Sequence, residues 1–123
     1  MKRLTRHLPL LQYLENLAPS EQKKIINGSN QDLLKLFSEL CLNITQKNIS
    51  LNSNQIKNLR RFENEIKKLS ERQHSFKSRK KILSKGSFLK TLLTELLPSL
   101  IEMILKKNEM RQSEIKNEEN VHD

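Results

Sequence analysis

Cysteine, glycine, proline and aromatic residues are scarce in this sequence of 123 residues. It has one cysteine, two glycines, three prolines, four phenylalanines, one tyrosine and no tryptophan. A single cysteine excludes an intramolecular disulfide, and with it the class of small secreted proteins that disulfides hold together. We therefore expect an intracellular location. The scarcity of rings also disfavours binding of single-stranded nucleic acid by base stacking.

Leucine and isoleucine supply most of the apolar content. There are 22 Leu and 10 Ile, against one Val and one Ala. This mixture, with so few glycines and prolines, favours long helices over a sheet. We predict an all-α fold, a small bundle of about five or six helices, formed by one chain or by an oligomer.

Apolar residues at helical spacing outline these helices. The predicted elements are a short helix after Pro9, a second through Ile26, a third over Leu33, Phe37, Leu40 and Ile44, one helix over 56–69, a basic helix over 76–85, and an apolar segment over 88–105. Ser29 and Ser53 are predicted N-caps. Pro98 lacks the amide that would pair with the Thr94 carbonyl, so we expect it to kink or split the last helix. Residues 106–123 are predicted as a frayed, disordered tail, which leaves a helical domain over 1–105.

The net charge of +9 is concentrated in one part of the chain. Residues 56–90 carry twelve positive and three negative charges, an excess of +9, whereas residues 91–123 carry four positive and seven negative charges. A basic block of this density suits a polyanion such as nucleic acid. The alternative is a lysine-rich helix face that only meets water.

Residues for catalysis or metal binding do not converge in the sequence. Cys41 lies on the apolar stripe of the third helix, which predicts a core position. His7, His74 and His122 are far apart, and no phosphate-cradling or nucleophile motif occurs. We therefore expect no enzyme, no cofactor and no metal site.

The basic block contains the candidate nucleic-acid contacts. Lysine and arginine bind phosphates by charge, whereas base reading needs side chains held at a groove edge. We predict binding without sequence specificity, with double-stranded DNA as the expected partner and RNA left open. The predicted contacts are Lys57, Arg60, Arg61, Lys67, Lys68, Lys77, Arg79, Lys80, Lys81 and Lys85.

Two clusters in the same block also resemble a nuclear import signal. Lys67-Lys68 and Arg79-Lys80-Lys81 are separated by ten residues, the spacing of a two-part signal. This spacing predicts a nuclear location, and it is compatible with phosphate binding by the same lysines.

The C-terminal apolar segment is the candidate surface for a partner or a second copy. Glu95, Glu102, Lys90 and Pro98 interrupt it, so it is too polar to cross a membrane. Its wide apolar face must be covered by the chain's own helices, by self-association, by a partner or by in-plane contact with a membrane. The acidic polar face disfavours the membrane. The residues of the apolar face are Phe88, Leu89, Leu92, Leu93, Leu96, Leu97, Leu100, Ile101 and Ile104.

The order of several short motifs resembles a small basic protein of Polinton (Maverick) elements and the related adintoviruses. The resemblance covers residues 2–101. The motifs are Lys2-Arg3 with Leu8-Pro9-Leu10-Leu11, Glu39-Leu40-Cys41-Leu42-Asn43-Ile44, Leu51 with Lys57-Asn58-Leu59-Arg60-Arg61-Phe62, Arg79-Lys80-Lys81-Ile82-Leu83 with Lys85-Gly86-Ser87-Phe88-Leu89, and Leu92-Leu93 with Leu96-Leu97-Pro98.

This resemblance implies a mobile, double-stranded DNA element with a virus-like capsid, in which a small basic protein accompanies the genome or the shell, in the nucleus or the virion. Ser87 stands where the family has a second glycine, and Glu95, Glu102 and the charged tail replace an apolar, glycine-rich end. The resemblance implies no catalytic residue. The alternative function is a minor capsid or scaffold protein that self-associates or binds a partner through the C-terminal helix.

Overall fold

The structure, a computed structural model, is all-helical over the residues it describes. These are 2–71 and 73–121, with side chains described over 3–71 and 73–107. They form seven helices: α1 (Lys2–Glu15), α2 (Pro19–Asn27), α3 (Gln31–Thr45), α4 (Ser53–Arg60), α5 (Glu63–Ser70), α6 (Phe76–Leu83) and α7 (Phe88–Val121). The prediction of an all-α fold is confirmed, with more helices than expected.

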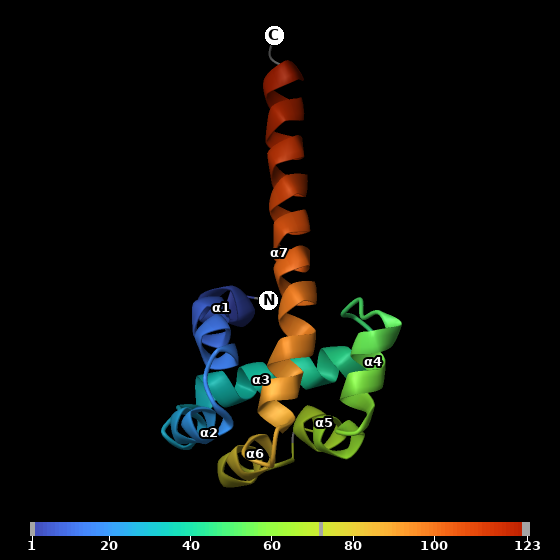
Figure 1. The fold of residues 1–123 in the computed structure, drawn as a ribbon. Helices are drawn as coiled ribbons and strands as arrows, with labels where there is room; N and C mark the ends of the chain where they lie inside the picture. The colour runs from blue at the N-terminus through green and yellow to red at the C-terminus, as the bar shows by residue number, and fades with distance from the viewer. Residues whose placement is uncertain (1, 72, 122–123) are drawn as a thin grey trace.

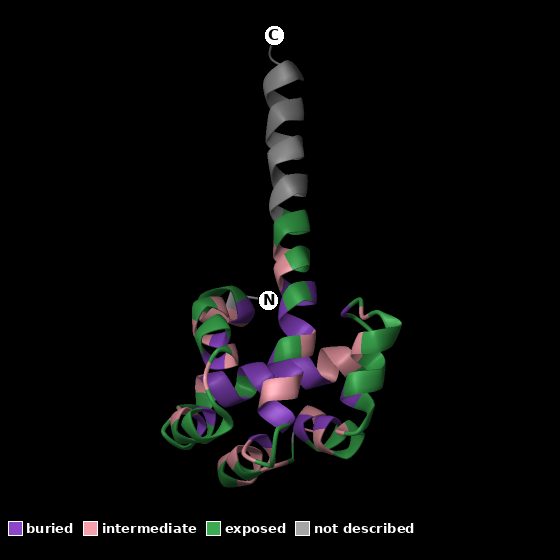
Figure 2. Ribbon diagram, viewed as in Figure 1, coloured by how far each residue is buried: buried purple, intermediate pink, exposed green. Residues whose placement is uncertain are grey.

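The helices surround α3 and the first half of α7. Figure 1 shows α1 and α2 at one end of α3, α4 and α5 at the other, and α7 extending away from the body. The closest packing is of α3 on α5, and of α7 on α1 and α4. Buried residues follow α3 and the first turns of α7 (Figure 2). The predicted stripe of the third helix is confirmed, because Leu33, Phe37 and Leu40 are buried.

Asparagine side chains cap the helices on which the site depends. Asn30 accepts a hydrogen bond from the Leu33 amide at 3.2 Å, and Asn52 accepts one from the Gln55 amide at 2.8 Å. The Gln55 side chain in turn accepts from the Asn52 amide, which completes a capping box. The predicted caps Ser29 and Ser53 are therefore wrong by one residue each.

The predicted helix over 56–69 is two helices, because α4 ends at Arg60 and α5 begins at Glu63. One straight helix would pack its narrow apolar stripe against a single neighbour. Here the two halves have different neighbours, because α4 packs on α7 and α5 packs on α3. The break at Arg61 and Phe62 lets both Leu59 and Ile66 reach the core. It also brings the Phe62 ring to 5.2 Å from the Phe88 ring, measured between centroids.

Two prolines lie inside helices. The sequence predicts Pro9 in the first turn of a helix, but α1 begins at Lys2, seven residues earlier. Pro98 does not split α7. Thr94 and Pro98 are both exposed, so the missing hydrogen bond lies on the exposed side of α7. Leu96, Leu97 and Leu100, before and after the proline, are buried in the core.

The predicted tail over 106–123 begins within α7. The helix runs to Val121, and an ion pair between Glu102 and Lys106 at 3.2 Å supports it where it leaves the body. Residues 122–123 lie outside the described part of the chain.

Charged residues join α1 to α3. Asp32 contacts the Arg3 Nε at 2.9 Å, the His7 Nε2 at 3.3 Å and the Arg6 guanidinium at 3.6 Å, and Arg3 also pairs with Glu39. The hydrogen bond from Arg3 lowers the pKa of Asp32, and burial acts in the opposite direction. The N-terminal arginines therefore have a structural role.

The C-terminus of α1 is held by side chains from two other helices. The Gln22 amide, 2% exposed, donates to the Leu14 carbonyl at 2.7 Å, and the Lys90 ammonium donates to the Glu15 carbonyl. We expect Gln22→Ala to lower the free energy of unfolding by about 2 kcal/mol, because it removes a buried hydrogen bond and its packing. Urea unfolding measures this, with exposed Gln12→Ala as the control. An equal effect of both variants would contradict this role of Gln22.

Candidate nucleic-acid interface

Six lysines line one groove between α2, α5 and α6. We call it the lysine groove, with a volume of about 790 Å³. Its lining consists of Lys23, Lys68, Lys77, Lys80, Lys81 and Lys85, with Asn27, His74, Ser78, Ile82 and Ser84. No carboxylate is among these lining residues, so the groove carries a concentrated positive charge.

The local sequence of α6 directs its lysines into this groove. Ser75 caps the helix by accepting a hydrogen bond from the Ser78 amide at 3.2 Å. Leu83 is buried in the core, and the partly buried Phe76 and Ile82 pack against the core. Lys77, Lys80 and Lys81 lie at i, i+3 and i+4, and therefore share a face.

Two of the six lysines have partners inside the chain. The Lys80 ammonium donates to the Asn27 carbonyl at 2.7 Å, at the C-terminus of α2, and lies 4.4 Å from the centre of the Phe76 ring. Lys85 pairs with Glu65 at 3.2 Å. The pKa of Glu65 is lowered, first by a hydrogen bond from its own main-chain amide and also by Lys85, against the opposing effect of burial.

The other four lysines are available for a ligand. Lys23, Lys68, Lys77 and Lys81 are exposed and have no hydrogen bond or ion pair within the described residues. Because they share one groove, a polyanion would meet four lysines at once, of which Lys68 also interacts electrostatically with Glu65.

The remaining predicted contacts lie elsewhere. Lys57 and Arg61 line a smaller pocket of about 370 Å³ between α4 and α7, where the Arg61 guanidinium donates to the Thr91 hydroxyl at 3.2 Å. Arg60 and Lys67 lie beside an apolar groove formed by α3, α4 and α5. Arg79 is half-buried and outside the lysine groove. The basic block is therefore divided among different surfaces.

The structure adds Lys23 to the candidate site. It lies on α2, more than forty residues before Lys68 in the sequence, and the packing of α2 against α6 brings it to the groove. The adjacent basic residues Lys23 and Lys24 can be seen in the sequence. Only the contact between α2 and α6 shows that Lys23 lies beside the lysines of α6. Each cluster of the predicted import signal is split between surfaces. Lys67 lines the apolar groove and Lys68 the lysine groove, and Lys80 and Lys81 line the lysine groove without Arg79.

Most of the C-terminal apolar face is in the chain's own core. Phe88, Leu92 and Leu97 are at most 2% exposed, and Leu89, Leu93, Leu96 and Leu100 are buried with them. These seven side chains are inaccessible to a partner in this fold. Of the predicted association surface, Ile101 and Ile104 alone are half-buried.

Cys41 and the histidines are the remaining residues considered for chemistry. Cys41 is 0% exposed, which confirms its predicted core position, and burial raises the pKa of its thiol to about 12. Over the described residues, no three His, Cys, Asp or Glu side chains are grouped for a metal ion. His122 lies outside these residues. No helix in the described part of the chain has the length and apolar character to cross a membrane.

Comparison of this chain with known protein families, with curated proteins and with solved structures gives no match.

Proposed function

We propose that this protein is a non-enzymatic, nucleic-acid-binding protein that contacts phosphates through the lysine groove. The observation that supports this most directly is the convergence of four unpaired lysines, from α2, α5 and α6, in a groove without a carboxylate. A lysine ammonium attracts phosphate as a point charge and has no planar fork for reading a base edge. Binding should therefore be independent of sequence.

The surroundings of the groove favour a duplex over an unpaired strand. No phenylalanine or tyrosine lines it, and the one imidazole among its lining residues, His74, is hydrogen-bonded to Glu71. Lys80 lies over the nearby Phe76 ring, and Phe62 packs on Phe88. Stacking of unpaired bases, on which most single-strand binding depends, therefore has little support in this groove. We therefore propose double-stranded DNA as the ligand. On the resemblance to Polinton and adintovirus proteins, we further propose that this DNA is a packaged or nuclear genome.

We expect the affinity for a random-sequence DNA duplex to fall steeply with salt. Each lysine that meets a phosphate adds roughly −0.9 to the slope of log affinity against log salt concentration, so four lysines predict a slope of roughly −4. Affinity should then drop on the order of a hundredfold between about 50 and 200 mM salt. Fluorescence anisotropy with a labelled duplex measures this.

Two comparisons complete the experiment. A second duplex of unrelated sequence should bind equally well, and a single strand of the same length should bind more weakly. An absent salt slope, or a strong preference for one duplex sequence, would contradict the proposed function.

A further inference from the structure

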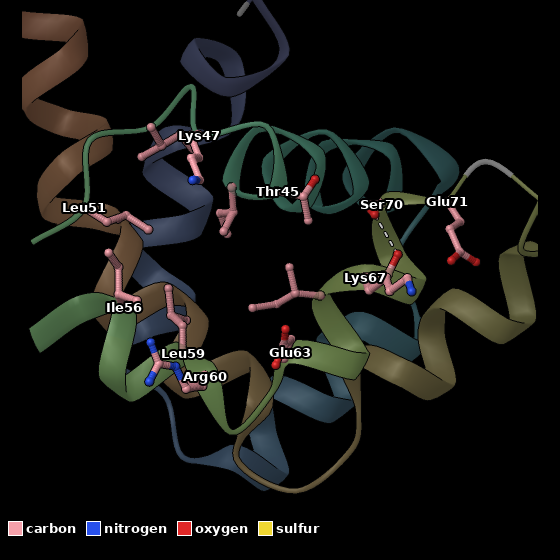
Figure 3. A pocket seen from close by; sticks show the side chains of 13 residues that line it. Thr45, Lys47, Leu51, Ile56, Leu59, Arg60, Glu63, Lys67, Ser70 and Glu71 are labelled. Atoms are coloured by element: carbon pink, nitrogen blue, oxygen red, sulfur yellow. Dashed lines mark hydrogen bonds between the residues drawn. The ribbon is translucent and has the colours of Figure 1, made fainter. Parts of the chain in front are cut away.

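An apolar groove opens where the end of α3, the loop after it, α4 and α5 meet. Its volume is about 860 Å³, in the range of pockets that hold ligands in proteins. Figure 3 shows Leu51, Ile56 and Leu59 pointing into it. Ile56 is 45% exposed although its neighbours Leu59 and Ile66 are buried. An aliphatic floor that remains open to water is typical of a surface that binds another apolar segment.

Charged side chains surround this floor. Lys47 lies at the turn that ends α3, in the left-handed conformation with φ 60°, and Arg60 and Lys67 lie on α4 and α5. None of these three cations has an ion pair within the described residues. Glu63 and Glu71 are also at the edge, and Glu71 pairs with His74. The unpaired charge at the edge is therefore mainly positive.

The same chain has a partly exposed apolar segment, in which Ile101 and Ile104 are half-buried and Leu105 is exposed. Where α7 leaves the body, Ile101, Ile104 and Leu105 lie at i, i+3 and i+4 on one face, and Leu105 is 56% exposed. In the sequence that follows, residues 108–123 carry five acidic and two basic residues. With Glu102, Lys106 and Lys107 included, residues 101–123 carry six acidic and four basic residues, a net charge of −2 that comes from the part after Lys107. The groove combines an aliphatic floor with a mainly positive edge.

We propose that the apolar groove of one chain binds the α7 segment around Ile101, Ile104 and Leu105 of a second copy. The groove and the segment are different surfaces, so the contact is heterologous and either closes into a reciprocal dimer or continues head to tail. It gives the protein a self-association surface distinct from the buried part of α7 and from the lysine groove. Because two helical turns cover less area than a standard interface, the association is weak and requires a high protein concentration.

Sedimentation velocity over a concentration series up to millimolar tests this proposal with two exposed point variants. The wild-type chain should rise above its monomer mass of 14.5 kDa. Ile56→Lys places a charge in the groove, and Leu105→Lys places one on the segment, so each variant alone should remain a monomer. An equimolar mixture should associate again, because the first variant keeps its segment and the second keeps its groove.

The matched control is Met103→Lys, which changes an exposed residue on the opposite side of the same helix turn and should leave association unchanged. Circular dichroism melting checks that all three variants are folded. A wild-type chain that remains at 14.5 kDa would overturn the proposal, and would leave the groove to another protein. It would equally be overturned if the mixed variants stayed monomeric, or if Met103→Lys abolished association.

Discussion

Replacing Lys23, Lys77 and Lys81 together by glutamine is expected to remove most of the salt dependence of duplex binding. The three side chains supply most of the unpaired charge in the lysine groove and make no hydrogen bond or ion pair within the described residues. With only Lys68 left of the four free lysines, the log-log slope should fall from roughly −4 to roughly −1. Affinity would then change only about three- to fourfold between about 50 and 200 mM salt.

The control for this triple variant is the same charge change outside the groove. Lys24, Lys35 and Lys107 are exposed and do not line it. Their replacement by glutamine should retain a slope close to that of the wild type. Both sets are surface substitutions, so neither should alter the free energy of unfolding by more than about 0.5 kcal/mol for each residue replaced. If the two triple variants lose affinity equally, binding depends on net charge alone and the groove has no special role.

The apolar stripes of the helices could be predicted from the sequence, because apolar residues that recur with the helical period mark the face that is buried. Leu33, Phe37 and Leu40 are buried together as their spacing indicates. The caps were less predictable, because Asn30 and Ser29 are neighbours and both types of side chain can cap a helix. Here Ser29 donates to the Ile26 carbonyl and Asn30 caps α3.

The distribution of charge over surfaces could not be predicted from the charge of a segment. Successive helical residues point about 100° apart, so a run of like charges is spread around the helix. Lys67 lines the apolar groove and Lys68 the lysine groove, although they are adjacent in the sequence. Lys23 joins Lys68 only because α2 packs against α6. Such long-range contacts leave no local signal in one sequence.

What covers the leucine-rich segment of α7 could not be predicted from the sequence either. Its spacing showed a wide apolar face but not what covers it. The structure covers the face with α1 and α4, which makes α7 a core helix up to Leu100. A core helix and a subunit interface respond differently to protein concentration, and a substitution at Phe88 distinguishes these two placements of α7.

Phe88→Ala is expected to produce the largest loss of stability among these variants. Phe88 is 0% exposed and its ring lies 5.2 Å from that of Phe62, where α4 and α5 meet. Truncating a buried phenylalanine costs about 3–5 kcal/mol, a large part of the roughly 6–18 kcal/mol expected for a chain of 123 residues. The thermal midpoint should fall by roughly 10–25 °C.

The dependence of this loss on protein concentration identifies what covers Phe88. If the chain's own helices cover it, the fall in midpoint is the same at every concentration, because any association through the apolar groove affects the wild type and the variant alike. If a second copy covered it, mass action would raise the midpoint with concentration in the wild type and remove that rise in the variant. Calorimetry over a wide concentration range measures both, with Tyr13→Ala, an aromatic side chain 57% exposed, as the control. A loss that changes with concentration would move Phe88 from the core of one chain to an interface between chains.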